Sequence, residues 1–422
     1  MGFSILSLII GSWWALVTSL IFRRRNDHFL LHLSLAVMLV IHFVVPAGLG
    51  ITRSLDEFAI GVWIVDNRLL KYTGLLYANL TLACTLIGYG LRSARSRRSS
   101  AGVGTCRDCR HRGFLRFIDW MTTLGIVGVA VLTNLRGTSG LPLASLGFTL
   151  SKYMCYGLAL SVFHNTLAGR TSIHMTANLV LFALQLLLKT GERSPMLAVG
   201  LAYLMAISGK RNRRATVTAI SSSMVVAVLA ISWQFVRWQW RFGDGLQALL
   251  QAFAVSLSSV VTLSLERGEL GYLYKACQGM MAIVPRQYDF MYGDSLVRLA
   301  LAFIPSSLFP LKPPETQLVT AGMLGVFSPG ASRPVTFMGD AYINFGWFGA
   351  AYGVALGYLI RLVQESPKRV SLSSLAISAL GPYAVALWLR GTLNGISVMI
   401  VWWLISRLSV ILSSMFSGRT RI

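Results

Sequence analysis

The chain has 422 residues, of which 55% are hydrophobic and 13% are charged, and its formal net charge is +23. Soluble domains carry about 25% charged residues, so this composition excludes an ordinary water-soluble protein and predicts an integral membrane protein. A basic soluble chain would suggest nucleic-acid binding. Here the cytoplasmic loops of a membrane protein, which collect lysine and arginine, explain the charge, and we expect no nucleic-acid partner.

Apolar runs of about twenty residues, each long enough to cross a ~30 Å hydrocarbon core, recur along the chain. They predict an all-α fold, a polytopic transmembrane helical bundle of about eleven spans (about ten to thirteen at the limits). Residues 1–236 hold the first eight, and residues 341–422 hold the last three and a tail. The expected spans are 3–22, 29–51, 69–91, 117–135, 146–168, 174–190, 195–209, 215–236, 341–361, 372–390 and 393–412.

Lysine and arginine cluster in alternate loops, and this pattern predicts the orientation of the chain. Basic runs follow the first, third, seventh and ninth expected spans, and Arg419 and Arg421 follow the last one. Positively charged loops stay in the cytoplasm. We therefore expect the N-terminus outside, the C-terminus in the cytoplasm and the long segment 237–340 outside.

The segment 237–340 differs from the short loops elsewhere. It opens beside an aromatic cluster that includes Trp238 and Trp240, which is typical of a membrane–water interface. Residues 246–265 and 270–284 are apolar but interrupted, and they predict amphipathic or shallowly inserted helices. Two full spans here stay an alternative, because a pair of spans would leave the predicted orientation of the rest of the chain unchanged. Half of the chain's twelve prolines lie between 305 and 334, which predicts irregular backbone in a loop of functional length.

Three stretches in or beside this loop are dense in polar, aromatic and turn-forming residues. They read YGDSL at 292–296, FIPSSLFPLKPPE at 303–315 and GDAYINFGWFG at 339–349. Together they resemble the Wzy-type oligosaccharide repeat-unit polymerases over roughly residues 284–349. The family often has arginine at the position of Ser306 and glutamate at the position of Asp340, so one cation is missing and one carboxylate has a shorter reach.

The resemblance implies a glycosyltransferase at the outer face of a bacterial inner membrane. Such an enzyme moves a glycan chain from undecaprenyl diphosphate to a sugar hydroxyl of a second lipid-linked repeat unit, and so builds surface polysaccharide. The implied partners are the lipid-linked donor and acceptor and the membrane lipids, with a chain-length regulator and a flippase as further candidates.

We expect neither a cofactor nor a metal ion. The outer loop holds no histidine and no tight cluster of acids that would suit a divalent cation. Cys106 and Cys109, followed by His111, lack the second ligand pair of a structural zinc site.

Candidate site residues follow from the chemistry. A leaving diphosphate needs fixed cations, and arginine pairs with two phosphate oxygens at once. Asp340 is the first choice for a general base, although a helix N-cap for a span starting near Ala341 explains it equally well. The expected catalytic residues are Asp340, Arg286 and Arg193, and the expected substrate-binding residues are Arg390, Arg333, Arg267, Lys312, Tyr288, Asp289, Tyr342 and Asn344. For each arginine the competing role is contact with lipid headgroups.

Two other functions stay open at this point. An O-antigen ligase of the related family relies on a histidine in its long periplasmic loop, whereas all six histidines lie outside 237–340. A lipid-linked oligosaccharide flippase would have short loops and charged residues along a central cavity. The long proline-rich outer loop and the scarcity of charges within the expected spans favour the polymerase.

Overall fold

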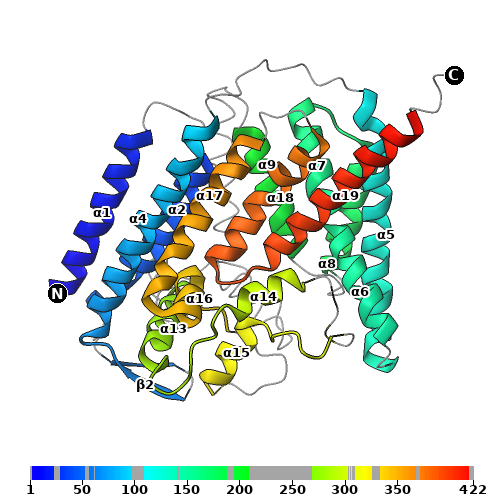
Figure 1. The fold of residues 1–422 in the computed structure, drawn as a ribbon. Helices are drawn as coiled ribbons and strands as arrows, with labels where there is room; N and C mark the ends of the chain where they lie inside the picture. The colour runs from blue at the N-terminus through cyan, green and yellow to red at the C-terminus, as the bar shows by residue number, and fades with distance from the viewer. Residues whose placement is uncertain are drawn as a thin grey trace, which may run out of the picture.

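In the computed structural model, the described residues form a bundle of helices that run side by side (Figure 1). Eight of the described helical segments are long and apolar enough to cross a membrane. The chain is therefore an all-α, multi-pass membrane protein, as the sequence predicts. The described residues are 2–22, 29–52, 57–60, 62–96, 109–139, 142–187, 194–208, 269–302, 304, 306, 309–325, 333–366 and 371–417.

The first half of the bundle follows the apolar runs closely. Each expected span coincides with helix except 215–236, which lies outside the described residues, as do residues 237–268. A π-helical turn (Val40–Val44) continues α2 into α3. The helices are α1 (Gly2–Phe22), α2 (Phe29–Leu39), α3 (Val45–Thr52), α4 (Leu70–Ser96), α5 (Cys109–Ser139), α6 (Pro142–Cys155), α7 (Gly157–Ala168), α8 (Ile173–Leu187) and α9 (Ser194–Ser208).

In the second half, a group of short helices precedes the long helices. Two of them, α14 and α15, have only seven and eight residues, and irregular backbone joins them, as the prolines predict. The elements are α13 (Glu269–Ile283), α14 (Asp294–Ala300), α15 (Thr316–Met323), α16 (Thr336–Phe345), the 3₁₀ segment η3 (Gly346–Ala351), α17 (Tyr352–Glu365), α18 (Leu372–Leu389) and α19 (Asn394–Ser417).

The span expected at 341–361 begins earlier than the sequence suggests and is interrupted. Asp340 lies inside α16, whose N-cap is Val335, so an N-cap role for Asp340 is wrong. Gly346 ends α16 with φ 56° and ψ −135°, a conformation that glycine adopts readily. A Cβ at this position would lie 3.0 Å from the ring of Phe290. The chain then turns through η3 into α17, which separates the short α16 from the rest of the span.

Close packing of α17 against α4 holds this interrupted helix in place. Added Cβ atoms at Gly353 and Gly357 would collide with the backbone of α4, so only small residues allow this approach of two helices. Further along α17, Arg361 donates to Glu365 at 2.6 Å and to the hydroxyl of Tyr89 on α4 at 3.1 Å. These contacts fix the axis of α17 and therefore the position of α16 at its start.

A layer of short elements covers one end of the bundle, and we call the described residues within 57–66 and 269–345 the end cap. It contains a hairpin of β1 (Glu57–Ile60) and β2 (Trp63–Asp66), which the sequence analysis did not predict. Val62 N–H donates to the carbonyl of Leu324 at 2.9 Å, and the indole of Trp63 donates to that of Met323 at 2.7 Å. The first residues of α1 lie at this end, and the last residues of α19 lie at the opposite end (Figure 1).

Cysteine labelling can determine on which side of the membrane the end cap lies. In a variant whose five native cysteines are replaced, Leu311→Cys places a thiol at a position that is 84% exposed. We expect an impermeant maleimide to label it in intact cells, because the charge pattern places this loop outside. Thr171→Cys, in a loop that the same pattern places in the cytoplasm, is the control. Labelling of Thr171→Cys alone would reverse the predicted orientation.

Candidate active site

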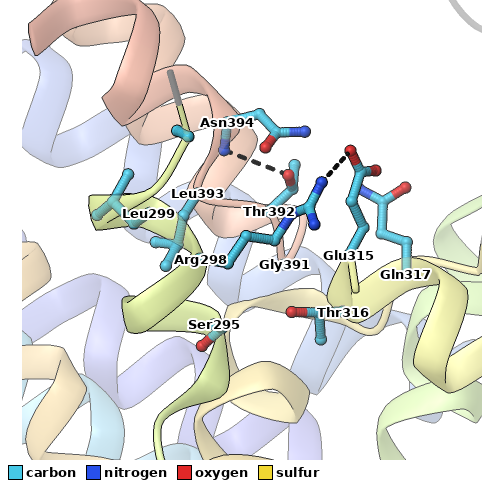
Figure 2. A pocket seen from close by; sticks show the side chains of 11 residues that line it. Ser295, Arg298, Leu299, Glu315, Thr316, Gln317, Gly391, Thr392, Leu393 and Asn394 are labelled. Atoms are coloured by element: carbon cyan, nitrogen blue, oxygen red, sulfur yellow. Dashed lines mark hydrogen bonds and ion pairs between the residues drawn. The ribbon is translucent and has the colours of Figure 1, made fainter. Parts of the chain in front are cut away.

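A pocket opens in the end cap between α14, the start of α15 and the turn from α18 to α19 (Figure 2). It holds about 350 Å³ of empty space, including its open mouth. Ser295 and Thr316 are buried side chains of its lining. The more accessible polar lining residues come from three separate segments and are Arg298, Glu315, Gln317, Thr392 and Asn394.

Arg298 is the cation of this pocket. Its guanidinium donates to the Glu315 carboxylate at 3.0 Å and to the carbonyl of Pro313 at 2.5 Å, and Figure 2 shows it reaching across toward Glu315. The Arg298 side chain is 19% exposed. Arginine carries five N–H donors, and these two bonds hold the fork in place while its exposed part faces the pocket. The arrangement suits an anion that enters from the mouth.

Lys312, a predicted substrate-binding residue, stabilises the loop beside this pocket. Its ammonium donates to the carbonyl oxygens of Ile304 at 2.7 Å and Ala302 at 3.4 Å. Burial and the neighbouring Arg298 lower the pKa of Lys312, and Glu315 opposes this shift. Lys312 therefore closes the loop that presents Glu315, and it is not among the residues that line the pocket.

Asp340 lies behind the pocket rather than in its lining. It is 1% exposed, and the side chain of Thr316, which does line the pocket, lies beside its carboxylate. One carboxylate oxygen accepts a long hydrogen bond of 3.4 Å from Asn344. The other makes no well-formed hydrogen bond to any described residue. The carboxylate thus reaches the pocket only through Thr316 and its neighbours.

Asn344, another predicted substrate-binding residue, is fully buried and has a structural role. Its amide nitrogen donates to the main-chain carbonyl of Asp340 at 2.8 Å, and its amide oxygen accepts from the N–H of Gly293 at 3.1 Å. Gly293 is the N-cap of α14 and has φ 95°. Asn344 therefore ties α16 to the helix that carries Ser295 and Arg298, and it is not exposed to bind a substrate.

Polar groups without good partners concentrate around Asp340. The Tyr352 hydroxyl lies near Ser295 and within electrostatic reach of Asp340, and Tyr77 lies within reach of Asp340 as well. Within the described chain, the hydroxyls of Ser295, Tyr352 and Tyr77 are buried without a well-formed hydrogen bond. Burying such groups costs free energy, so this cluster is a poor structural core and a good candidate for a chemical site.

Four predicted residues form a separate group on the α13 side of the end cap. Arg286 and Asp289 are exposed in the turn after α13, and Tyr288 between them is half-buried. Arg286 lies within electrostatic reach of Tyr342, whose ring packs edge-on against Tyr77 with centroids 5.6 Å apart. The structure thus brings Arg286, Tyr288 and Asp289 to one surface with the buried Tyr342 beneath it, and none of the four lines the pocket of Arg298.

Two predicted arginines flank the pocket. Arg390 is exposed and precedes Gly391, which lines the pocket with φ 87° and packs so closely on Thr336 that an added Cβ would lie 2.7 Å from its carbonyl oxygen. The guanidinium carbon of Arg333 lies 5.2 Å from the centre of the Tyr272 ring, and the main-chain N–H of Arg333 donates to the main-chain carbonyl of Gln317 at 2.9 Å. Arg193 and Arg267 lie outside the described residues.

Six polar residues of the pocket lining were not named as site residues from the sequence, although Ser295 and Glu315 lie within the quoted motifs. They are Arg298, Glu315, Thr316, Ser295, Thr392 and Asn394. Arg298 lies in the last turn of a short helix, where a basic residue is ordinary, so its sequence context carries no signal. The polar pair Thr392 and Asn394 meets it only because the turn from α18 to α19 folds onto the end cap.

The described residues contain no group of three or more histidines, cysteines or acids placed to hold a metal ion. In the comparisons with known proteins, no family model, no curated protein and no solved structure matches this chain. The geometry of this pocket and the motifs within residues 284–349 are therefore the features that indicate its function.

Proposed function

We propose that this protein polymerises undecaprenyl-diphosphate-linked oligosaccharide repeat units into surface polysaccharide at the outer face of the membrane. The observation that carries the proposal is a pocket lined by Arg298, Ser295 and Thr316, in which Thr316 lies beside the buried Asp340 carboxylate. Arginine and a carboxylate are the groups that transfer of a glycan from a diphosphate requires. Two lining residues, Ser295 and Glu315, belong to the loop motifs that resemble the polymerases.

In the proposed reaction, the acceptor hydroxyl attacks the anomeric carbon of the donor while the bond to the diphosphate oxygen breaks. The diphosphate leaves with growing negative charge, which Arg298 at the pocket and Arg390 beside its mouth neutralise. The acceptor proton passes to the Thr316 hydroxyl as the Thr316 proton passes to Asp340. Asp340 then acts through Thr316 and does not contact the sugar.

The surface around Arg286 is the proposed place for the glycan itself. Its exposed cation and acid, next to the half-buried Tyr288 ring, offer hydrogen bonds and an aromatic edge to sugars, and the buried Tyr342 supports them from below. This surface lies on the end cap together with the pocket, so one lipid-linked molecule would contact both. Under this proposal Arg286 and Asp289 contribute to binding of the glycan and not to the bond-breaking step.

Deletion of the gene tests the proposed function. We expect the surface polysaccharide to be reduced to single repeat units, because units are exported but not joined. Electrophoresis of surface polysaccharide measures the chain-length distribution. Long chains that remain on the lipid carrier would indicate a ligase, and repeat units trapped inside the cell would indicate a flippase. A normal distribution of chain lengths would contradict all three.

A further inference from the structure

A second polar groove lies between the first half of α5 and the start of α8, away from the end cap. It encloses about 590 Å³ of empty space, including its open side. The lining residues of each helix are spaced by three, four and seven positions, which places them on one helix face. They are Arg116, Asp119, Trp120 and Thr123 from α5, and His174, Ala177, Asn178 and Leu181 from α8.

The inner wall of the groove is a fixed network around an acid. Asp119 is 7% exposed, and its carboxylate accepts from the Ser161 hydroxyl on α7 at 2.7 Å. The Asn178 amide donates to the Asp119 carbonyl at 3.0 Å, and the Thr123 hydroxyl donates to the Asn178 amide oxygen at 2.7 Å. These bonds orient Asp119, which lines the groove, before any ligand arrives.

The rim carries a guanidinium and an imidazole. Arg116 and His174 are both exposed, and His174 lies within electrostatic reach of Asp119. His174 is the second residue of α8, where the positive end of the helix dipole also favours an anion. The groove therefore offers an anion site at its rim and a carboxylate at its wall.

Apolar surface continues from this charged region. Trp120 is 64% exposed and Leu181 is 40% exposed, and both belong to apolar helices, α5 being a candidate span. The tryptophan ring lies 6.4 Å from the His174 ring, centre to centre, as in an interfacial belt. Charged groups beside an exposed apolar face match the boundary between lipid headgroups and hydrocarbon.

We propose that this groove binds an aminophospholipid, with a primary ammonium and a phosphate diester in its headgroup. The ammonium donates to Asp119, the phosphate lies between Arg116 and His174, and an acyl chain runs along Trp120 and Leu181. A purely anionic lipid would leave Asp119 facing more negative charge, and a trimethylated ammonium has no N–H to donate. The charge pattern of the chain assigns this end to the cytoplasmic leaflet, so the site is independent of the proposed polymerase pocket.

Lipid binding to the purified full-length protein tests this proposal. Native mass spectrometry in detergent would compare phosphatidylethanolamine, phosphatidylcholine and phosphatidylglycerol. We expect phosphatidylethanolamine to bind about three- to tenfold more tightly than the other two, as one charge-assisted contact near a surface supports. Asp119→Asn should remove the preference for phosphatidylethanolamine over phosphatidylcholine. Arg116→Gln should weaken the binding of phosphatidylethanolamine and of phosphatidylcholine by the same factor.

Arg170→Gln, which removes an exposed cation from the nearby turn after α7, is the matched control and should change nothing. Tighter binding of phosphatidylglycerol would overturn the proposal in favour of a simple anion site. Equal binding of the three lipids by the unaltered protein would overturn it as well. Because Asp119 is buried, its variant can lose stability, and the headgroup preference of the unaltered protein and the exposed Arg116→Gln then decide the question.

Discussion

Arg298→Gln should lower the rate of polymer formation by roughly ten- to a hundredfold, which corresponds to the loss of one charge-assisted contact of about 1.5–3 kcal/mol. The reason is that Arg298 is the guanidinium that lines the pocket, where the diphosphate leaves in the proposed reaction. The measurement is the initial rate with purified lipid-linked repeat units, at equal protein in the membrane. Arg298→Lys should recover little, because lysine cannot pair with two phosphate oxygens.

The partner of Arg298 provides the control for a purely structural role. Glu315→Gln removes the ion pair of 3.0 Å but keeps the cation, and partly exposed pairs of this kind contribute about 0–1 kcal/mol. We expect Glu315→Gln to lower the rate by no more than about fivefold, and Arg170→Gln to leave it unchanged. Equal losses of rate for Arg298→Gln and Glu315→Gln would show that the ion pair only stabilises the loop. Arg298 would then no longer be assigned to the proposed site.

Asp340→Asn should abolish most of the activity while the fold survives. Asparagine has nearly the same shape but cannot take a proton, so the relay through Thr316 fails, and the expected loss is on the order of a hundredfold or more, as for removal of a general base. Replacing an unpaired buried carboxylate with an amide removes a costly charge from the interior. The thermal unfolding midpoint in detergent should therefore stay level or rise, and it should be recorded with the rate.

Asp66→Asn is the matched control, because Asp66 is an exposed acid of the same end cap and lies outside the pocket. It should retain full activity. Comparing the two variants distinguishes a chemical role of Asp340 from a structural one. If Asp340 were structural, Asp340→Asn would lower the stability of the protein and its activity together. Full activity of Asp340→Asn would remove the carboxylate from the reaction and leave the arginines and hydroxyls of the pocket as its candidates.

Some elements of the fold could be predicted from the sequence and others could not. The apolar runs place nearly every described helix of the bundle, because a lipid-facing helix must be apolar along a length that matches the membrane. The prolines correctly predict irregular backbone over the described residues 309–315, whereas α15 (Thr316–Met323) is a helix within the stretch expected to be irregular. The β1–β2 hairpin was missed because its strands have four residues each, and contacts to Met323 and Leu324 hold it rather than a local pattern.

The sequence by itself determined that the chain crosses a membrane repeatedly and that a polar, proline-rich segment follows residue 284. Both are properties of solvation and of local backbone, which each segment carries alone. Only the tertiary structure decided that Arg298, Thr316 and Thr392 share a pocket, that Asp340 lies behind it inside a helix, and that Asn344 and Lys312 stabilise their surroundings. These facts depend on the Gly346 break and on the close packing of α17 against α4, and such contacts join residues that are far apart in the chain.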